Sequence, residues 1–387
     1  MVAKTLYGLE GVLADEIRAI GGKSIREGNR AVEFTGGKEI LYKANFHLRT
    51  ATRILVSIAS FRCRDEFDLY REVKNIKWPQ YLKADGSLAI SAVLNRSNLD
   101  NTHYAALKTK DAIVDRFRDE FGKRPDVDLD NPDLRISVHV HQNKATIALD
   151  SSGEPLFRRG YRIEGGVAPL SEVLAAGIIY LTGWDKKIPL VDPMCGSGTI
   201  PVEAAMLAKN IAPGLVGRKY GFMKWKDFDR DLLEKIKIDA KSEIIRSCPA
   251  EIIGSDMSAK CIDEARGNAK RAGVSDAVKF AVKRMEKIGS DREEGCLIMN
   301  PPYGERLAVG EKRKFYGMIG DSLKNNFTGF TAWVLTGNLD APVQIGLRPK
   351  RKIKLYNSPI ECRLLKYELY SGSRKQKYQL PEGDQSV

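Results

Sequence analysis

Apolar residues near the start of the chain recur at a spacing typical of a helix. In the segment GLEGVLADEIRAIGG, Leu9, Leu13, Ile17 and Ile20 share one helix face, and a Gly-Gly pair ends the pattern. The segments AVEF and KEILYKANFHL then predict a short strand and a second helix. Residues 1–55 are therefore predicted to form a small α+β subdomain.

Strand and helix patterns continue over residues 56–155. LYREVKNIKW and HYAALKTKDAIVDRFRDEFG have helical spacing, whereas SLAISAVL, LRISVHVHQ and KATIALD alternate as half-buried strands do. No catalytic constellation occurs here, so we interpret this region as a binding module. His139 and His141 share one strand face, but two ligands do not make a structural metal site, and solvent-facing strand residues are the favoured interpretation.

The segment SSGEPLFRRGYRIEGG is rich in glycine, serine and arginine, which is typical of a linker, here placed at residues 156–167. Arginine and tyrosine also combine phosphate contact with base stacking. The side chains that offer this second interpretation are Arg158, Arg159, Tyr161 and Arg162. The sequence leaves both interpretations open.

Apolar strands and amphipathic helices alternate over residues 168–372, which predicts a doubly wound α/β sheet. RKIKLYNS and ECRLLKYELY are consecutive strand patterns, so the sheet is predicted to close with an antiparallel hairpin. A long charged helix is expected near residues 226–246, within an insertion. Residues 373–387 are polar and are predicted to be a disordered tail.

Composition narrows the class of protein. The 387 residues are 43% hydrophobic, which excludes a fully disordered chain, and no apolar run approaches the ~20 residues of a membrane span. The start lacks an apolar leader, so a cytoplasmic protein is expected. The six cysteines form no CxxC pair, which argues against a disulfide framework and a metal site. The net charge of +13 favours a polyanion such as RNA, with general solubility as the alternative.

Two motifs in the third region suggest a nucleotide-like ligand. A predicted strand ends at Asp192, and Gly196 and Gly198 follow in a loop before a helix that starts near Ile200. Such glycines let a ligand approach the backbone, and the helix start offers free N–H groups. The loop is neither a GxGxxG fingerprint nor a lysine-bearing P-loop. Asp256 ends the next strand, where an acidic residue commonly binds ribose hydroxyls; a plain helix cap is the alternative.

The motif Asn300-Pro301-Pro302-Tyr303 follows the apolar strand CLIM. An exocyclic amine on a nucleobase is a poor nucleophile because its lone pair is delocalised into the ring. The Asn300 side-chain oxygen and the Pro301 carbonyl can accept its hydrogens and favour a nucleophilic nitrogen, while the prolines stiffen the loop. Tyr303 offers a face for stacking the base. The motif therefore predicts methylation of a base amine, with a plain Pro-Pro turn as the alternative.

Residues 190–304 resemble class I S-adenosylmethionine-dependent methyltransferases that modify amines. Longer segments, among them RTATRILVSIASF, LYREVKNIKWPQYL, LDSSGEPLFRRGYR and DPMCGSGTIPVEAAMLAKNIAPG, resemble the THUMP-domain RNA guanine-N2 methyltransferases. The resemblance is strongest to the N-terminal half of the bifunctional bacterial 23S rRNA enzymes and their single-function homologues. It implies a ferredoxin-like subdomain (1–55), a THUMP domain (56–155) and a Rossmann-like catalytic domain (168–372).

The resemblance also assigns site residues. It implies that S-adenosyl-L-methionine contacts Asp192, Cys195, Gly196, Ser197, Gly198, Thr199, Asp256, Met257 and Asn300. It implies that the guanine is held by Asn300, Pro301, Pro302 and Tyr303. Many relatives have a carboxylate after the third strand that contacts the adenine; here Arg284 lies near that place and Glu286 follows, so this contact is left unassigned.

The resulting hypothesis is methylation of guanine N2 in 23S rRNA or a large-subunit precursor, with no metal, no membrane and no required oligomer. Only one catalytic domain is present in the sequence, so only one modification is expected. The alternatives are the same reaction on tRNA, adenine N6 methylation, and a non-catalytic RNA-binding assembly factor. The sequence identifies no target nucleotide.

Overall fold

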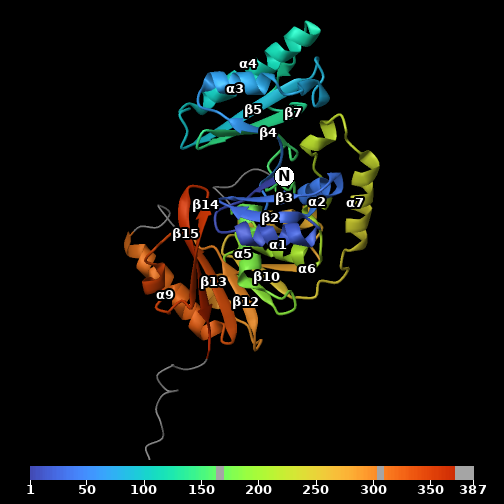
Figure 1. The fold of residues 1–387 in the computed structure, drawn as a ribbon. Helices are drawn as coiled ribbons and strands as arrows, with labels where there is room; N and C mark the ends of the chain where they lie inside the picture. Colours follow the sequence, from blue (N-terminus) through green and yellow to red (C-terminus); the bar gives the residue numbers. More distant parts are fainter. Residues whose placement is uncertain (163–169, 303–308, 371–387) are drawn as a thin grey trace, which may run out of the picture. The chain divides into compact units, whose positions relative to one another are not determined.

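The computed structural model describes residues 1–162, 170–302 and 309–370. These residues divide into two compact units (Figure 1). Unit 1 holds the described residues of Met1–Gly165, Ser171–Gly177 and Lys209–Arg246, and unit 2 holds those of Gly166–Leu170, Ile178–Ala208 and Ser247–Val387. The insertion in the third region of the sequence therefore belongs, by its contacts, to the unit built from the N-terminal half.

Unit 1 is built on one eight-stranded sheet with the order β2-β3-β1-β4-β8-β7-β5-β6. Its strands are β1 (Val2–Lys4), β2 (Lys23–Gly28), β3 (Ala31–Thr35), β4 (Arg53–Arg62), β5 (Ser87–Asn95), β6 (Asp126–Val127), β7 (Leu134–His141) and β8 (Lys144–Asp150). Its helices are α1 (Glu10–Ala19), α2 (Lys38–His47), α3 (Glu66–Lys74), α4 (Thr102–Phe121) and α7 (Arg230–Ser242), with short 3-10 helices η1 (Trp78–Gln80), η2 (Pro213–Val216) and η3 (Gly221–Lys224). Strand β5 runs parallel to both of its neighbours, and the other pairs are antiparallel.

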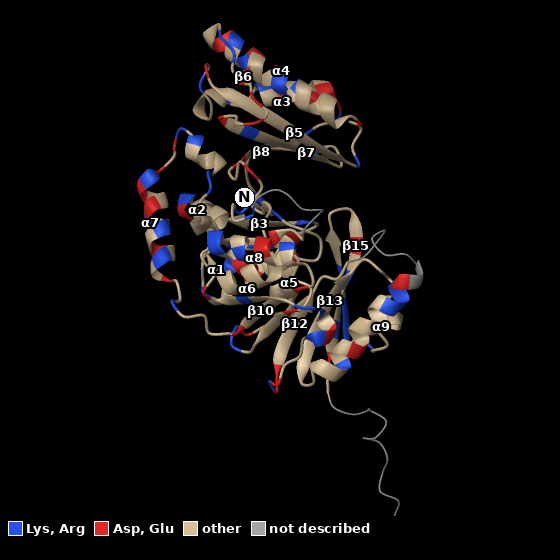
Figure 2. Ribbon diagram, turned by 180° about the vertical axis from the view of Figure 1, so that it is seen from behind, with Lys and Arg blue, Asp and Glu red and all other residues tan. Residues whose placement is uncertain are grey.

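The insertion helix α7 is amphipathic, with one charged and one apolar face, and Figure 2 shows charged residues recurring along its ribbon. Asp229 caps its N-terminus by accepting a hydrogen bond from the Leu232 N–H at 3.0 Å. Leu233, Ile236 and Ala240 on the other face are buried in the core formed by α1, α2 and the first strands. This burial explains why the insertion belongs to unit 1.

Strand β7 alternates as predicted, with every second residue from Leu134 onward buried. His139 and His141 lie half-buried on the opposite face, with ring centroids 6.3 Å apart. No group of three His, Cys, Asp or Glu side chains that could hold a metal ion occurs among the described residues. The predicted helix over LYREVKNIKW is too long: α3 ends at Lys74, and Pro79 lies in the separate turn η1.

The hypothesis that the arginine-rich segment contacts RNA is wrong for two of its four side chains. Arg159 and Tyr161 are 1% and 0% exposed. The Arg159 guanidinium donates to the Arg49 carbonyl at 2.8 Å, within the core of unit 1. Arg162 is also largely covered and lies 3.7 Å from Glu172, whereas Arg158 is exposed. A buried guanidinium held by backbone carbonyls fixes the segment to unit 1.

Unit 2 is the predicted α/β domain, and its fold class is confirmed. Its sheet has the order β11-β10-β9-β12-β13-β15-β14, with the first five strands parallel and the last two forming an antiparallel hairpin. Its strands are β9 (Leu190–Asp192), β10 (Ile252–Asp256), β11 (Val278–Val282), β12 (Gly295–Met299), β13 (Phe330–Thr336), β14 (Arg351–Asn357) and β15 (Ile360–Glu368). Its helices are α6 (Thr199–Ala208), α8 (Ala259–Arg271), α9 (Val309–Asn326), α10 (Ala341–Gln344) and the turn η4 (Met285–Lys287), while α5 (Glu172–Thr182) begins in unit 1.

The chain order of this sheet reverses at β9, because β10 and β11 extend to one side and β12 and β13 to the other. In open parallel sheets, ligands bind outside the carboxyl ends of the strands at such a reversal. None of the helices in the described ranges is long and apolar enough to cross a membrane. The predicted tail at 373–387 lies outside the described residues.

Candidate functional site

Strand register brings the predicted site residues to one edge of the sheet in unit 2. Asp192 ends β9 and pairs with Gly254 of β10, so Asp256 extends two residues beyond it on one side. Asn300 directly follows β12, the neighbour of β9 on the other side. The glycine loop after β9 lies between them in the strand order. Residues separated by more than 100 positions in sequence thus converge on the expected ligand edge.

The loop from β9 to α6 requires glycine at two positions for different reasons. Gly196 and Gly198 both have positive φ, at 53° and 80°. A Cβ on Gly198 would lie 2.8 Å from the Ala265 Cβ of helix α8, which is too close, whereas a Cβ on Gly196 would meet nothing within 4 Å. Gly198 therefore allows the loop to pack on α8, and Gly196 leaves open space beside the backbone.

The Asp256 side chain connects this loop to the end of β10 through a hydrogen bond. One carboxylate oxygen accepts the Gly196 N–H at 3.1 Å, and the other accepts the Ser258 N–H at 2.9 Å. The N-cap of α8 is Ser258, whose hydroxyl accepts from the Cys261 N–H, so the helix-cap interpretation of Asp256 is wrong. A carboxylate offers about four lone-pair positions, and the half-buried Asp256 retains capacity for further donors. Met257 beside it is 65% exposed.

Asp192 lies beneath the loop and is 1% exposed. One of its oxygens accepts the Met194 N–H at 3.1 Å. Burial raises the pKa of this carboxyl well above its ordinary value, and the negative charge of Asp256 adds to the effect. Burial likewise raises the pKa of the Cys195 thiol, so this cysteine is not an activated nucleophile. The buried side chains of Asp192 and Cys195 therefore support the conformation of the loop.

Of the other two predicted loop residues, Ser197 is half-buried and Thr199 is 5% exposed at the start of α6. The Ser197 carbonyl accepts a hydrogen bond from the Asn268 amide at 2.8 Å. Asn268 lies on α8, and no pattern in the sequence singled it out. Its role depends on the tertiary contact between α8 and the loop.

Asn300 carries the polar atom that most directly indicates a ligand. Its side-chain oxygen is buried and has no hydrogen-bond partner among the described residues. A buried acceptor without a donor is unfavourable by about 1–3 kcal/mol, so such atoms in folded proteins usually face a missing partner. Pro301 is buried and Pro302 is exposed, while Tyr303 lies outside the described residues. The arrangement can receive an N–H donor such as a base amine.

The sequence pattern did not indicate a second buried polar atom at this edge of the sheet. The Ser255 hydroxyl, directly before Asp256, is buried without a hydrogen-bond partner within the described ranges. A serine in an apolar strand gives no signal until its neighbours are known.

Arg284 and Glu286 are both exposed after β11, and neither is placed against the loop by a contact among the described residues. The group that meets an adenine therefore stays unassigned.

Three parts of the chain match known family models. Residues 1–55 match the RlmL ferredoxin-like domain, residues 63–150 match the THUMP domain, and residues 159–366 match the RMKL-like methyltransferase domain. The last match includes both the glycine loop and the Asn300 motif.

Whole-chain comparisons agree with these matches. The chain is 40% identical over 374 residues to the ribosomal RNA large subunit methyltransferase K/L of Syntrophotalea carbinolica, covering 94% of this chain and 52% of that protein. It is 38% identical to the protein slr0064 of Synechocystis, covering 95% and 96% of the two chains. The crystal structure of SMU.472 complexed with SAH superposes with a TM-score of 0.87 at 31% identity, over 96% and 98% of the chains. The chain spans about half the length of the K/L proteins that it matches.

Proposed function

Because the chain belongs to the RMKL-like methyltransferase family, we propose that it methylates the exocyclic N2 amine of a guanine in 23S rRNA, using S-adenosylmethionine. The observation that carries the proposal is the buried, unpartnered side-chain oxygen of Asn300. It is a hydrogen-bond acceptor placed at the edge of the sheet where ligands bind, directly before a stiff Pro-Pro segment.

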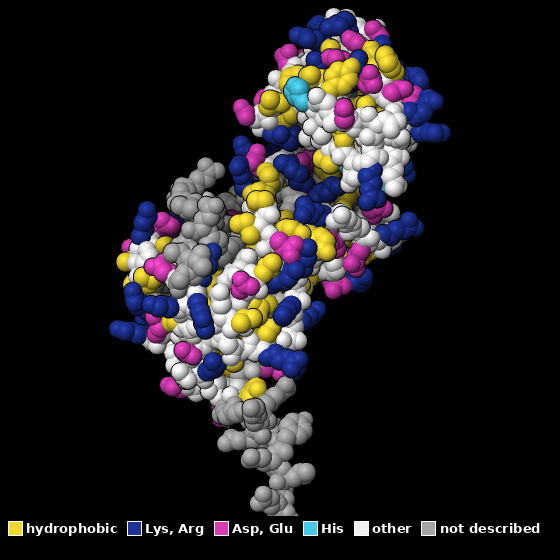
Figure 3. Space-filling model, turned by 90° about the vertical axis from the view of Figure 1, so that its left-hand side faces the viewer, with side chains coloured by type: hydrophobic (Ala, Val, Ile, Leu, Met, Phe, Trp, Pro, Cys, Tyr) yellow, Lys and Arg dark blue, Asp and Glu magenta, His cyan; other side chains and the backbone are white. Residues whose placement is uncertain are grey.

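Three observations support RNA as the substrate. The relative from Syntrophotalea carbinolica is named for ribosomal RNA of the large subunit. Residues 63–150 match the THUMP domain, and the chain carries a net charge of +13. On the face shown in Figure 3, lysine and arginine side chains are dispersed among acidic and hydrophobic ones. The excess charge therefore favours a polyanion without by itself marking where it binds.

The loop after β9 fits S-adenosylmethionine. SMU.472, which shares the fold over nearly its whole length, was crystallised with SAH. Gly196 provides open space beside a positive-φ backbone, and the Asp256 carboxylate beside it can accept ribose hydroxyls. The exposed Met257 provides an apolar surface next to that carboxylate, suited to a purine. Asp192, Cys195, Ser197 and Thr199 hold the loop in shape around this space.

The chemistry requires little from the protein beyond orientation. S-adenosylmethionine held at the loop after β9 would supply a methyl group on a sulfonium, and the C–S bond would break as the C–N bond forms, leaving S-adenosylhomocysteine. The Asn300 oxygen and the Pro301 carbonyl accept the amine hydrogens and hold the nitrogen lone pair out of conjugation with the base. The amine loses one proton after transfer, so no strong base is needed. A guanine within a helix must leave its stack to reach such acceptors.

Replacing Asn300 tests the proposal. Asn300→Ala removes the acceptor, and we expect the single-turnover methylation rate to fall by about 100-fold or more, comparable to loss of one oxyanion-hole donor. Asn325→Ala is the control, since it removes an exposed amide from helix α9. Equal rates for wild type and Asn300→Ala would show that this acceptor does not orient the reacting amine.

A further inference from the structure

A cavity of about 670 Å³ lies within unit 1, and neither the glycine loop nor Asn300 is among the residues that line it. Its wall is assembled from four stretches of chain: the N-terminal residues with helix α2, strand β4, strands and turns of the 63–150 region, and the insertion around Trp225. A volume of this size is within the range of ordinary small-ligand sites. Nothing in the proposed methyl transfer uses it.

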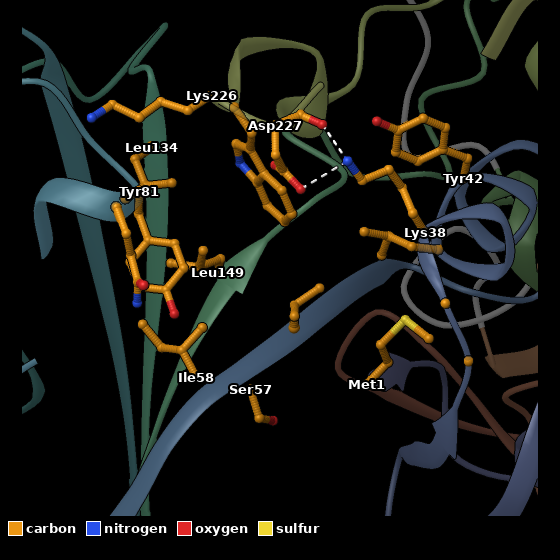
Figure 4. Close-up of a pocket in the computed structure, with 16 residues that line it drawn as sticks. Met1, Lys38, Tyr42, Ser57, Ile58, Tyr81, Leu134, Leu149, Lys226 and Asp227 are labelled. Carbon is orange, nitrogen blue, oxygen red and sulfur yellow. Dashed lines mark hydrogen bonds and ion pairs between the residues drawn. The ribbon is translucent and has the colours of Figure 1, made fainter. Parts of the chain in front are cut away.

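Two tyrosines line opposite sides of the cavity and differ in how open the ring is, because Tyr42 is 2% exposed whereas Tyr81 is half-buried. Figure 4 shows Tyr81 with Ile58 on one side and Tyr42 with Lys38 on the other. Tyr42 stacks on Phe222 with ring centroids 4.1 Å apart, and its hydroxyl accepts a hydrogen bond from the Asp229 N–H. Tyr81 packs edge-on against Trp78, with ring centroids 6.3 Å apart. Tyr42 therefore supports the wall from behind, and the half-buried Tyr81 offers the ring on which a flat, unsaturated group can stack.

Trp225 adds a polar group to this wall. Its ring packs against both hydrophobic cores of unit 1, so its position is fixed. The indole N–H is nevertheless buried and has no acceptor in the described part of the chain. Buried tryptophan N–H groups usually find an acceptor. A carbonyl oxygen or ring nitrogen of a nucleobase is an acceptor of the required kind.

The charges at the rim favour a ligand that carries one negative group. The Lys38 ammonium lies 3.1 Å from the Asp227 carboxylate, so these two charges largely cancel (Figure 4). The Lys226 ammonium donates to the Pro79 carbonyl at 2.5 Å and has no carboxylate partner within the described residues. An ammonium has three donors, which leaves Lys226 able to bind a phosphate oxygen.

We propose that this cavity binds one unpaired nucleobase of the RNA substrate, with the adjoining phosphate on Lys226. The inference rests on the proposed RNA substrate and deepens it, because it assigns to unit 1 a single-stranded element of the recognition site. The base is held and not chemically changed here. Stacking on aromatic side chains contributes about 1–3 kcal/mol per base, enough for the cavity to distinguish single-stranded from paired RNA.

A cavity-filling variant of the full chain tests this inference. Gly37 lines the cavity with an ordinary negative φ of −81°, and a Cβ there would meet nothing within 4 Å, so Gly37→Trp places a ring in the cavity without a backbone clash. Ser60→Trp, an exposed position on strand β4 outside the cavity wall, is the control. A second pair compares Lys226→Ala with Lys235→Ala, since both remove one exposed lysine of the insertion.

Two probes are used: a fluorescein-labelled single-stranded 12-nucleotide RNA containing 4-thiouridine, and the same strand in a duplex. We expect Gly37→Trp to weaken single-strand binding at least tenfold, Lys226→Ala to weaken it severalfold, and both controls to bind as wild type. Photocrosslinks are expected at Tyr81 or Trp225. S-adenosylmethionine binding by each variant reports that it is folded.

Unchanged single-strand affinity in both cavity variants, or crosslinks confined to other regions, would overturn the inference. If wild type methylates RNA while the cavity variants bind the strand normally, the inference alone fails and the proposed function stands. If wild type transfers methyl groups to no RNA, the proposed function fails. These outcomes separate the two claims.

Discussion

The buried carboxyl group of Asp192 makes stability depend on pH. Burial raises its pKa in the folded protein well above the value in the unfolded chain, near 4. Above that ordinary pKa, the folded state therefore binds more protons than the unfolded state. Stability contributed at this residue is greatest at acid pH and declines as pH rises toward the folded pKa.

Asp192→Asn removes that titration while keeping an oxygen for the Met194 N–H. We expect the ligand-free variant to be more stable than wild type at pH 8, with the difference shrinking as pH falls toward 4. Urea unfolding between pH 4 and pH 8 measures this. Parallel stability curves for the two proteins would mean that Asp192 does not titrate differently on folding.

At the residue scale, the sequence indicated candidate side chains for the site but not how they are connected by hydrogen bonds. Asp192, Asp256 and Asn300 could be identified because each ends a strand or directly follows one. The amide of Asn268 and the hydroxyl of Ser255 could not, since their relevance depends on packing between elements. The roles of the predicted residues in binding stay predictions until variants are measured.

At the element scale, the glycine loop gives a matched pair of substitutions. Gly198→Ala combines a positive φ with a contact 2.8 Å from the Ala265 Cβ, whereas Gly196→Ala has a positive φ and open space. We expect Gly198→Ala to lower the free energy of unfolding by about 1–3 kcal/mol more than Gly196→Ala does. Denaturant unfolding compares them directly, and equal losses would show that the loop does not rely on close packing with α8.

Helix α7 gives a second matched pair. Ile236 is buried in the core of unit 1, while Ile238 on the same helix is 64% exposed. We expect Ile236→Ala to destabilise the protein by about 2–5 kcal/mol and Ile238→Ala by less than about 0.5 kcal/mol. Equally small effects on thermal unfolding would contradict the placement of this insertion in the core.

The elements that the sequence predicted well are those with strong periodicity. Strand β7 and the amphipathic α4 and α7 are examples, since one face of each is buried. Strand β2 escaped prediction because none of its residues is buried, so it lacks a hydrophobic alternation. Strand β4 was not predicted because a bulge between Ser57 and Ala59 shifts the strand register and interrupts the alternation of buried and exposed residues.

At the scale of the whole molecule, the resemblance to THUMP-domain methyltransferases drawn from sequence segments is confirmed by the family matches. The division into units could not be predicted in full. The insertion at 209–246 is continuous in sequence with the catalytic region, yet its contacts place it with the N-terminal half. The unit to which the insertion belongs depends on which hydrophobic core buries the apolar face of α7. The periodicity of the sequence predicts that face but not the core that buries it.

At all three scales we infer the same reaction, in which a base amine from RNA is held at Asn300 and methylated beside the glycine loop. The most direct test offers labelled S-adenosylmethionine with unmodified 23S rRNA, 16S rRNA and bulk tRNA, followed by digestion and identification of the methylated nucleoside. Asn300→Ala serves as the inactive control. The account predicts N2-methylguanosine, in 23S rRNA alone. The same nucleoside in tRNA would contradict the substrate, N6-methyladenosine would contradict the base, and no transfer to any RNA would contradict the claim as a whole.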